Sequence, residues 1–133
     1  DHSSRAGRIY ARAGGVSDAV RMTVEQLNPG RPIRIRTEVA SGIPACRAMI
    51  DSIRSGNRGA NFFEGMGCVG GCVGGPKAVL DRETGRENVE RYGDEAEYGT
   101  PLNNPYVLEL LERLGFETVE EFLEKSDIFD REL

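Results

Sequence analysis

The chain contains few of the residues that a conventional metal site or a disulfide framework needs. Its 133 residues include three cysteines and one histidine, His2. It has no apolar stretch as long as a membrane span. It also has no run of basic residues, and its formal net charge is −5. We therefore expect no membrane span and no binding to nucleic acid or to a membrane surface.

Length and composition predict a single domain, 1–133, with a modest core, since 38% of the residues are hydrophobic. No secretory signal is recognisable, and we expect a cytoplasmic protein. The chain begins at Asp1 rather than at a methionine, so we expect it to be a piece of a longer protein.

The first part of the chain, about 1–80, shows alternating strand and helix patterns. Residues 8–13 are expected to form a short strand or an extended segment, and apolar spacing predicts a helix over 16–27. Alternating apolar and polar residues predict a strand over 32–39 with one wet face. A proline start and a glycine stop predict a helix over 44–55, and 60–63 is expected to be a short apolar strand. Strand, helix and strand at this length indicate a parallel β-α-β unit, with a site beyond the strand's carboxyl end.

Two features of this part have both a ligand-binding and a structural interpretation. Gly14 and Gly15 precede a predicted helix, whose N-terminus could bind an anion, but a tight turn is the favoured interpretation. Cys46 lies in the apolar stripe of the helix 44–55, so a small buried apolar role is favoured over a ligand role.

The second part, about 81–133, is predicted to be an acidic helical tail. A capping box beginning at Thr84 predicts a polar helix through Tyr98. Asn104 is expected to cap the next helix, which ends at Gly115, and Thr118 begins a second capping box. The expected fold class is therefore α/β: a small parallel or mixed sheet with packed helices, followed by a helical C-terminal extension.

The segment from Glu64 to Pro76 is the most informative of the chain. It contains Cys68 and Cys72, and six of its thirteen residues are glycine. Glycine allows positive φ angles and the close approach of main-chain N–H groups. Thiolates with amide donors nearby are what an iron–sulfur cluster requires. We interpret the segment as a metal-cluster loop.

Other uses of Cys68 and Cys72 are disfavoured by their surroundings. Their C-x-x-x-C spacing is not typical of zinc, and Cys46 and His2 are distant in sequence, so we do not expect four Cys/His ligands. A Cys68–Cys72 disulfide is possible in geometry but unexpected without a secretory signal. Either another polypeptide segment completes a cluster, or the loop is a redox dithiol, and we prefer the first.

The cysteine loop closely resembles a motif of a known family. Residues Phe63 to Pro76 resemble the third cluster-binding motif of iron-only (FeFe) hydrogenases. Upstream, Tyr10 to Ala19 resembles the family's aromatic-x-x-x-Gly-Gly-Val-x-Glu-Ala segment. Residues 41–46 and the helix start at Asn104 also look family-like, so the resemblance covers nearly the whole chain. It implies the C-terminal portion, one half, of a two-lobed hydrogenase catalytic domain.

The resemblance implies a cofactor and an activity. In this family the H-cluster is a 4Fe-4S cubane joined through one cysteine to a two-iron subcluster, and the reaction is reversible reduction of protons to hydrogen, with ferredoxin as electron donor. Cys68 matches a terminal ligand of the cubane, and Cys72 matches the bridging thiolate. Met66 and Tyr10 match residues beside the two-iron centre. No catalytic residue is assigned within this chain.

The departures from the family pattern limit what the chain does alone. Tyr10 in place of a phenylalanine and Asp18 in place of a glutamate are conservative changes, and Gly67 in place of an alanine is a mild one. Gly65 in place of a valine suggests a divergent subgroup. The family's other two cubane cysteines, its proton-relay cysteine and its cyanide-binding lysine lie in motifs that these 133 residues lack.

We therefore expect an inactive fragment when isolated, weakly iron-loaded at most, with the loop 65–76 mobile. Its partner is expected to be the rest of the hydrogenase catalytic domain. The alternative is a non-catalytic hydrogenase-like sensor or an iron–sulfur assembly protein.

Overall fold

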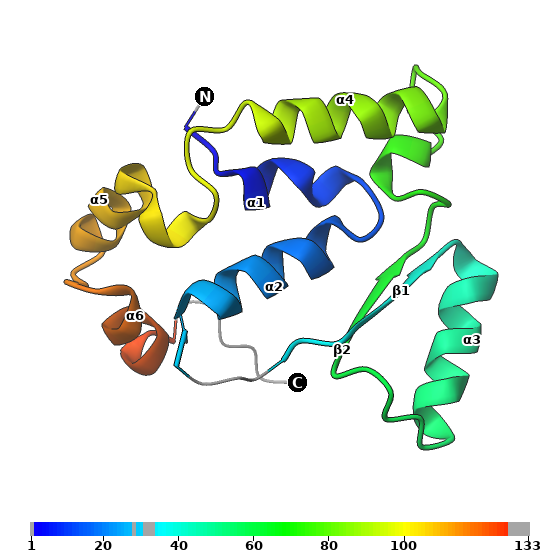
Figure 1. Ribbon diagram of the computed structural model, residues 1–133, viewed down its shortest axis with the longest axis horizontal. Helices are drawn as coiled ribbons and strands as arrows, with labels where there is room; N and C mark the ends of the chain where they lie inside the picture. The colour runs from blue at the N-terminus through cyan, green and yellow to red at the C-terminus, as the bar shows by residue number, and fades with distance from the viewer. Residues whose placement is uncertain (1, 28, 31–33, 128–133) are drawn as a thin grey trace.

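A computed structural model of the chain describes residues 2–27, 29–30 and 34–127, and confirms the α/β class (Figure 1). Helices α1, α2 and α4 form one group, and the two strands with α3 lie beside it. Helices α5 and α6 lie near the C-terminal end of α2. The elements in chain order are α1 (Arg5–Arg8), the 3-10 helix η1 (Ile9–Ala11), α2 (Gly15–Leu27), β1 (Thr37–Ser41), α3 (Ile43–Arg54), β2 (Phe62–Met66), η2 (Cys72–Gly74), α4 (Arg82–Asp94), η3 (Pro101–Asn103), α5 (Pro105–Arg113) and α6 (Val119–Lys125).

Strands β1 and β2 are parallel and are connected by α3, so the predicted β-α-β unit is confirmed. Their register runs from Thr37 opposite Phe62 to Ser41 opposite Met66. Pro44 lies in the first turn of α3, where its missing N–H costs nothing. Helix α3 ends before Gly56, which adopts a φ of 89°. The unit places the end of β2 directly before the cysteine loop.

The bounds of both strands and the covered face of β1 differ from the sequence prediction. Strand β1 begins at Thr37; of the residues predicted before it, 34–36 are not in a strand and 32–33 lie outside the described residues. Strand β2 covers 62–66 rather than 60–63. Val39 is 42% exposed while Ala40 is 7% exposed, the reverse of the expected face. The reason is that alternation defines which residues share a face, whereas the packing of α3 over Ala40 decides which face is covered.

The prediction of a strand over residues 8–13 is wrong. Most of this segment is helical, in α1 and η1, and only Arg12 is in β pairing, as an isolated bridge. The hydroxyl of Ser4 accepts a hydrogen bond from the Gly7 amide (3.3 Å) and caps α1. Ala6 and Ile9, three residues apart, are both buried, which is the spacing of a helical face.

The core of the described chain is small, and many large apolar side chains remain exposed. The centre of the helical group is Ile9, which is 1% exposed and lies close to Gly93 of α4. The other buried apolar residues are Ala6, Ala19, Ala40, Met49 and Leu111. Exposed apolar side chains occur along α3 and the cysteine loop, including Ile43, Ile50, Val69, Val79 and Leu80. These surfaces are available for packing against further protein.

The C-terminal helices begin mostly where capping residues predicted them. Asn104 accepts a hydrogen bond from the Tyr106 amide (3.1 Å) and caps α5, and Thr118 caps α6. The predicted capping box at Thr84 is wrong, and so is the predicted end at Tyr98. Asp81 caps α4 by accepting a hydrogen bond from the Thr84 amide, so Thr84 is a donor within the first turn. Within the described residues, none of these helices has the length and apolar character needed to cross a lipid bilayer.

Candidate functional site

The cysteine loop follows β2 and turns tightly around Cys72. The amide of Gly71 donates to the Cys68 carbonyl (3.0 Å), and the amide of Gly75 donates to the Cys72 carbonyl (3.0 Å). Gly70 and Gly71 both have φ angles of 90°, in the region that only glycine enters at low cost. The two cysteines are therefore the side-chain-bearing ends of a turn that is otherwise almost bare backbone.

The loop is attached to the segment before α2. Arg12 and Gly71 form an antiparallel bridge, and the Ala13 amide donates to the Gly70 carbonyl (2.9 Å). A Cβ atom at Gly71 would lie 2.6 Å from the Ala13 nitrogen, which is closer than real Cβ contacts allow. Only glycine fits at this position without a steric clash. The close contact places η1 next to the loop.

The two predicted ligands present thiols of different exposure. Cys68 is half-buried, Cys72 is exposed, and both are free. Cys72 borders an apolar hollow of about 260 Å³. The hollow is also lined by Ala11, Val73, Ala78, Val79, Leu80 and Gly85. The thiols are therefore uncommitted to a disulfide, and one of them faces a surface of apolar side chains.

The other two predicted site residues lie at the edges of this loop. Met66 is the half-buried last residue of β2, and its carbonyl accepts a hydrogen bond from the Gly42 amide (2.8 Å). Tyr10 lies in η1 and is 49% exposed. Its neighbour Ala11 lines the hollow beside Cys72. The fold thus brings the Tyr10 segment and the cysteine loop together, although the two are far apart in the sequence.

Cys46 occupies a different place from the loop cysteines. Its thiol lies on the α3 side of the sheet and donates to the carbonyls of Met66 (3.4 Å) and Ala40 (3.7 Å). It is half-buried, in keeping with the apolar role predicted for it. Within the described ranges, no three His, Cys, Asp or Glu side chains are grouped closely enough to hold a metal ion.

The donor chemistry of the loop fits an iron–sulfur cluster as a partial ligand set. Cys68 and Cys72 are two free soft donors, and a Cβ at Gly75 would lie 3.6 Å from the Cys68 sulfur, so absence of that atom leaves room beside it. A cubane takes four protein ligands, so two have to come from elsewhere.

Glu64, immediately before the loop, was not predicted to be a functional position, yet it is buried with 5% exposure. Its carboxylate accepts hydrogen bonds from the amides of Gly14 (2.8 Å) and Ser17 (2.7 Å), at the start of α2. The helix N-terminus therefore binds an anion from within the chain. The signal in the sequence was a single acid within an otherwise apolar strand.

Arg12 is a second residue that the sequence did not single out. Its side chain is 8% exposed, and its guanidinium is paired with Asp18 of α2 (2.6 Å) and Glu90 of α4 (2.5 Å). Burial alone would lower the pKa of Arg12, but the hydrogen bond to Asp18 and the charge of Glu90 outweigh it and raise that pKa above its ordinary value. The cation is permanent and holds both helices beside the loop.

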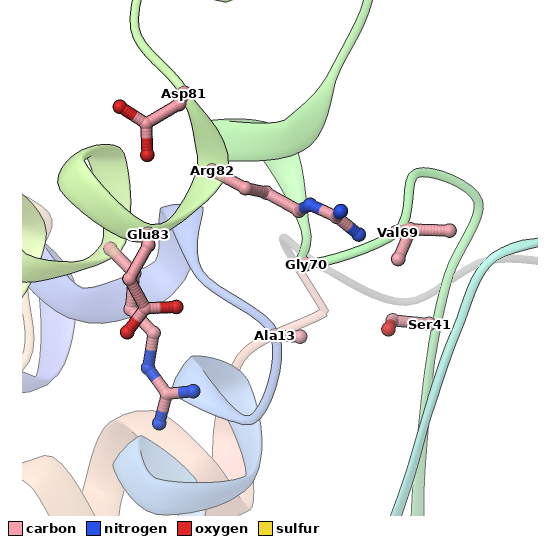
Figure 2. Close-up of a pocket in the computed structure, with 8 residues that line it drawn as sticks. Ala13, Ser41, Val69, Gly70, Asp81, Arg82 and Glu83 are labelled. Atoms are coloured by element: carbon pink, nitrogen blue, oxygen red, sulfur yellow. The ribbon is translucent and has the colours of Figure 1, made fainter.

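A larger hollow of about 470 Å³ lies on the α4 side of the loop (Figure 2). Val69 and Gly70 of the loop, Ala13, and Ser41 form one side of it. The other side consists of residues at the start of α4: Asp81, Arg82, Glu83 and Arg86. The side chain of Arg82 extends from α4 toward Gly70 and Val69.

Comparison with known proteins identifies the family of this chain. The family model described as iron only hydrogenase large subunit, C-terminal domain, matches residues 1–76, which include η1, the β-α-β unit and the complete cysteine loop. No curated protein matches the chain. Because the match covers more than half of the 133 residues, the chain belongs to the family of the C-terminal domain of the iron-only hydrogenase large subunit.

Proposed function

We propose that this chain supplies two thiolate ligands, Cys68 and Cys72, to the iron–sulfur cluster of an iron-only hydrogenase. The observation that supports this most directly is the attachment of the loop: the turn between the two cysteines is paired through Gly71 with Arg12, inside the region that matches the family. This pairing fixes the position of the short turn that carries both sulfurs.

The roles that we propose for the site residues are those that the family resemblance implies. Cys68, which is half-buried, would hold the 4Fe-4S cubane as a terminal ligand, and Cys72, which is exposed, would supply the thiolate shared with the two-iron subcluster. Met66 and Tyr10 would line the space beside the two-iron centre. When bound, this H-cluster supplies reversible reduction of protons to hydrogen, with electrons from ferredoxin.

In this proposal, the chain's own residues bind the cluster and shield it from water. A Cβ atom at Gly75 would lie 3.6 Å from the Cys68 sulfur, so glycine leaves room for the cluster beside this ligand. The apolar residues around Cys72 would exclude water once further protein covers them. Two ligands remain to be supplied by the rest of the catalytic unit, which we propose packs over exposed apolar residues in and just after the loop, such as Val69 and Val79. Residues about 1–80 then carry the site and about 81–133 form a supporting helical part.

The experiment is hydrogen evolution by the complete catalytic unit, matured with its two-iron centre and given a reduced electron donor. We expect turnover in the parent and none in Cys68→Ala or Cys72→Ala, each with a lower iron content. Cys46→Ala is the matched control, because that thiol lies on α3 and contacts only backbone carbonyls in hydrogen bonds. It should retain both iron and turnover.

Two outcomes would contradict the proposal. Turnover that survives Cys72→Ala would show that Cys72 is not the bridging ligand. A parent that carries its full cluster but does not turn over would indicate the alternative role, a hydrogenase-like sensor or an iron–sulfur assembly protein.

A further inference from the structure

Arg82, the first residue of α4, lies directly against the cysteine loop. A Cβ atom built at Gly70 would lie 2.6 Å from the Cδ of Arg82, and one at Gly74 would lie 2.9 Å from the same atom. Gly70 and Gly74 are the residues two before and two after Cys72. The methylene stem of Arg82 therefore covers both sides of the turn that presents this thiol.

The charge of Arg82 is not neutralised by the part of the chain that the structure describes. There, its guanidinium takes part in no ion pair and no hydrogen bond. Asp81 next to it is engaged by Thr84, whose hydroxyl (2.7 Å) and amide (3.0 Å) both donate to the carboxylate. Figure 2 shows Arg82 extending toward Gly70 and Val69, away from Asp81 and Glu83.

This arrangement contrasts with the other arginine beside the loop. Arg12 is nearer the core and is paired with two carboxylates, so it adds little net charge at the site. Arg82 has its stem on the loop and its cation unpaired. The chain has a net charge of −5, so an uncompensated cation at this position is not a consequence of a generally basic surface.

We propose that Arg82 raises the reduction potential of the iron–sulfur cluster held by Cys68 and Cys72, an inference that rests on the proposed function. Reduction adds one electron to a thiolate-bound cluster that is already anionic, with no bond formed or broken. A fixed cation stabilises the reduced form more than the oxidised form, because their charges differ by one. Net charge near a cluster is one of the terms that set its potential.

The test is a redox titration of the loaded catalytic unit with dithionite, followed by the electron paramagnetic resonance signal of the reduced cubane. Arg82→Gln removes the charge, and Arg82→Lys keeps it. We expect Arg82→Gln to lower the equilibrium constant for reduction by roughly fivefold, since solvent attenuates a surface charge. A tenfold change would correspond to about 59 mV for a one-electron couple. Arg82→Lys should keep the parent potential.

Arg86→Gln is the matched control. Arg86 lies one turn further along α4 and lines the same hollow, but it is not among the atoms nearest to the loop glycines. Arg86→Gln removes the same charge from a position further from the loop, so it should shift the cluster potential less than Arg82→Gln does. Should Arg82→Gln not assemble, Arg82→Met keeps the methylene stem and removes the same charge.

The outcomes separate this inference from the proposed function. A fully loaded Arg82→Gln or Arg82→Met unit with the parent potential would overturn the inference and leave the ligand roles of Cys68 and Cys72 intact. An equal shift in Arg82→Lys would also overturn it, because packing and not charge would then be responsible. Full cluster loading in both Cys68→Ala and Cys72→Ala would overturn the proposed function and this inference with it.

Discussion

The backbone of Arg12 pairs with that of Gly71, which lies between the two cysteines of the loop. The side chain of the same arginine is paired with Asp18 in α2 and with Glu90 in α4. One residue thus connects the cysteine turn to two helices. Its main chain sets the position of the turn, and its buried charge sets the position of the helices around it.

Gly71→Ala should destabilise the fold and weaken cluster loading. Gly71 has a φ of 90°, and an added Cβ would lie 2.6 Å from the Ala13 nitrogen. Strain and overpacking together should lower the free energy of unfolding by about 2–4 kcal/mol, measured by urea denaturation. Gly99→Ala is the control, since a Cβ there meets nothing within 4 Å. Equal stability of the two variants would contradict the tight contact between the loop and residue 13.

Arg12→Ala should be far more damaging than removal of a surface arginine. The Arg12 side chain is 8% exposed, and its loss leaves Asp18 and Glu90 without their shared cation. We expect the free energy of unfolding to fall by about 2–4 kcal/mol, somewhat less than for a fully buried pair because both acids are partly exposed. In Arg21→Ala, which breaks exposed pairs with Asp18 and Glu25, the change should stay within about 0.5 kcal/mol. A small effect at Arg12 would show that its ion pairs do not hold the helices.

Glu64→Gln should loosen the start of α2. The glutamine side chain has one acceptor oxygen, so it can satisfy the amide of Gly14 or of Ser17 but not both, and it loses the charge that favours a helix N-terminus. We expect a loss of about 1.5–3 kcal/mol in unfolding free energy, with faster hydrogen exchange at the Ser17 amide. Glu87→Gln, at an exposed position in the middle of α4, should change neither quantity. Unchanged exchange at Ser17 in Glu64→Gln would mean that the carboxylate is not its partner.

The cap of α4 should make stability depend on pH in the acid range. The hydroxyl and amide of Thr84 donate to Asp81 and hold the pKa of Asp81 below its ordinary value of 3.8. A carboxylate with a lowered pKa in the folded state contributes stability above its unfolded pKa, and this contribution is lost as the pH falls through the folded pKa.

Asp81→Asn isolates that contribution, because asparagine caps helices equally well but does not titrate. Unfolding free energies of the parent and of Asp81→Asn, compared between about pH 6 and pH 2, should differ by a constant amount at the upper end. Below about pH 4 the parent should lose stability relative to the variant. Parallel curves over the whole range would show that the Asp81 cap is not coupled to folding.

Local features of the molecule were predictable from the sequence because their causes are local. Pro44 and Gly56 mark the start and end of α3, and Asn104 and Gly115 mark those of α5. These signals were readable because caps and stops act through neighbouring backbone groups. The resemblance carried by the cysteine loop identified the family that the match over residues 1–76 shows. Where two local signals competed, as at Asp81 and Thr84, the sequence favoured the wrong one.

The arrangement around the loop was decided only by tertiary structure. The carboxylate of Glu64 on the amides of α2, the pairing of Arg12 with Gly71 and the stem of Arg82 on Gly70 all join residues distant in the chain or separated by a turn. Segment 8–13 is helical because Ile9 is buried against other helices, and Ala40 rather than Val39 is covered because α3 packs on that side. The sequence by itself determined the two thiols of Cys68 and Cys72 and the glycines around them, whereas the charges and contacts near these thiols depend on long-range packing, which no local pattern encodes.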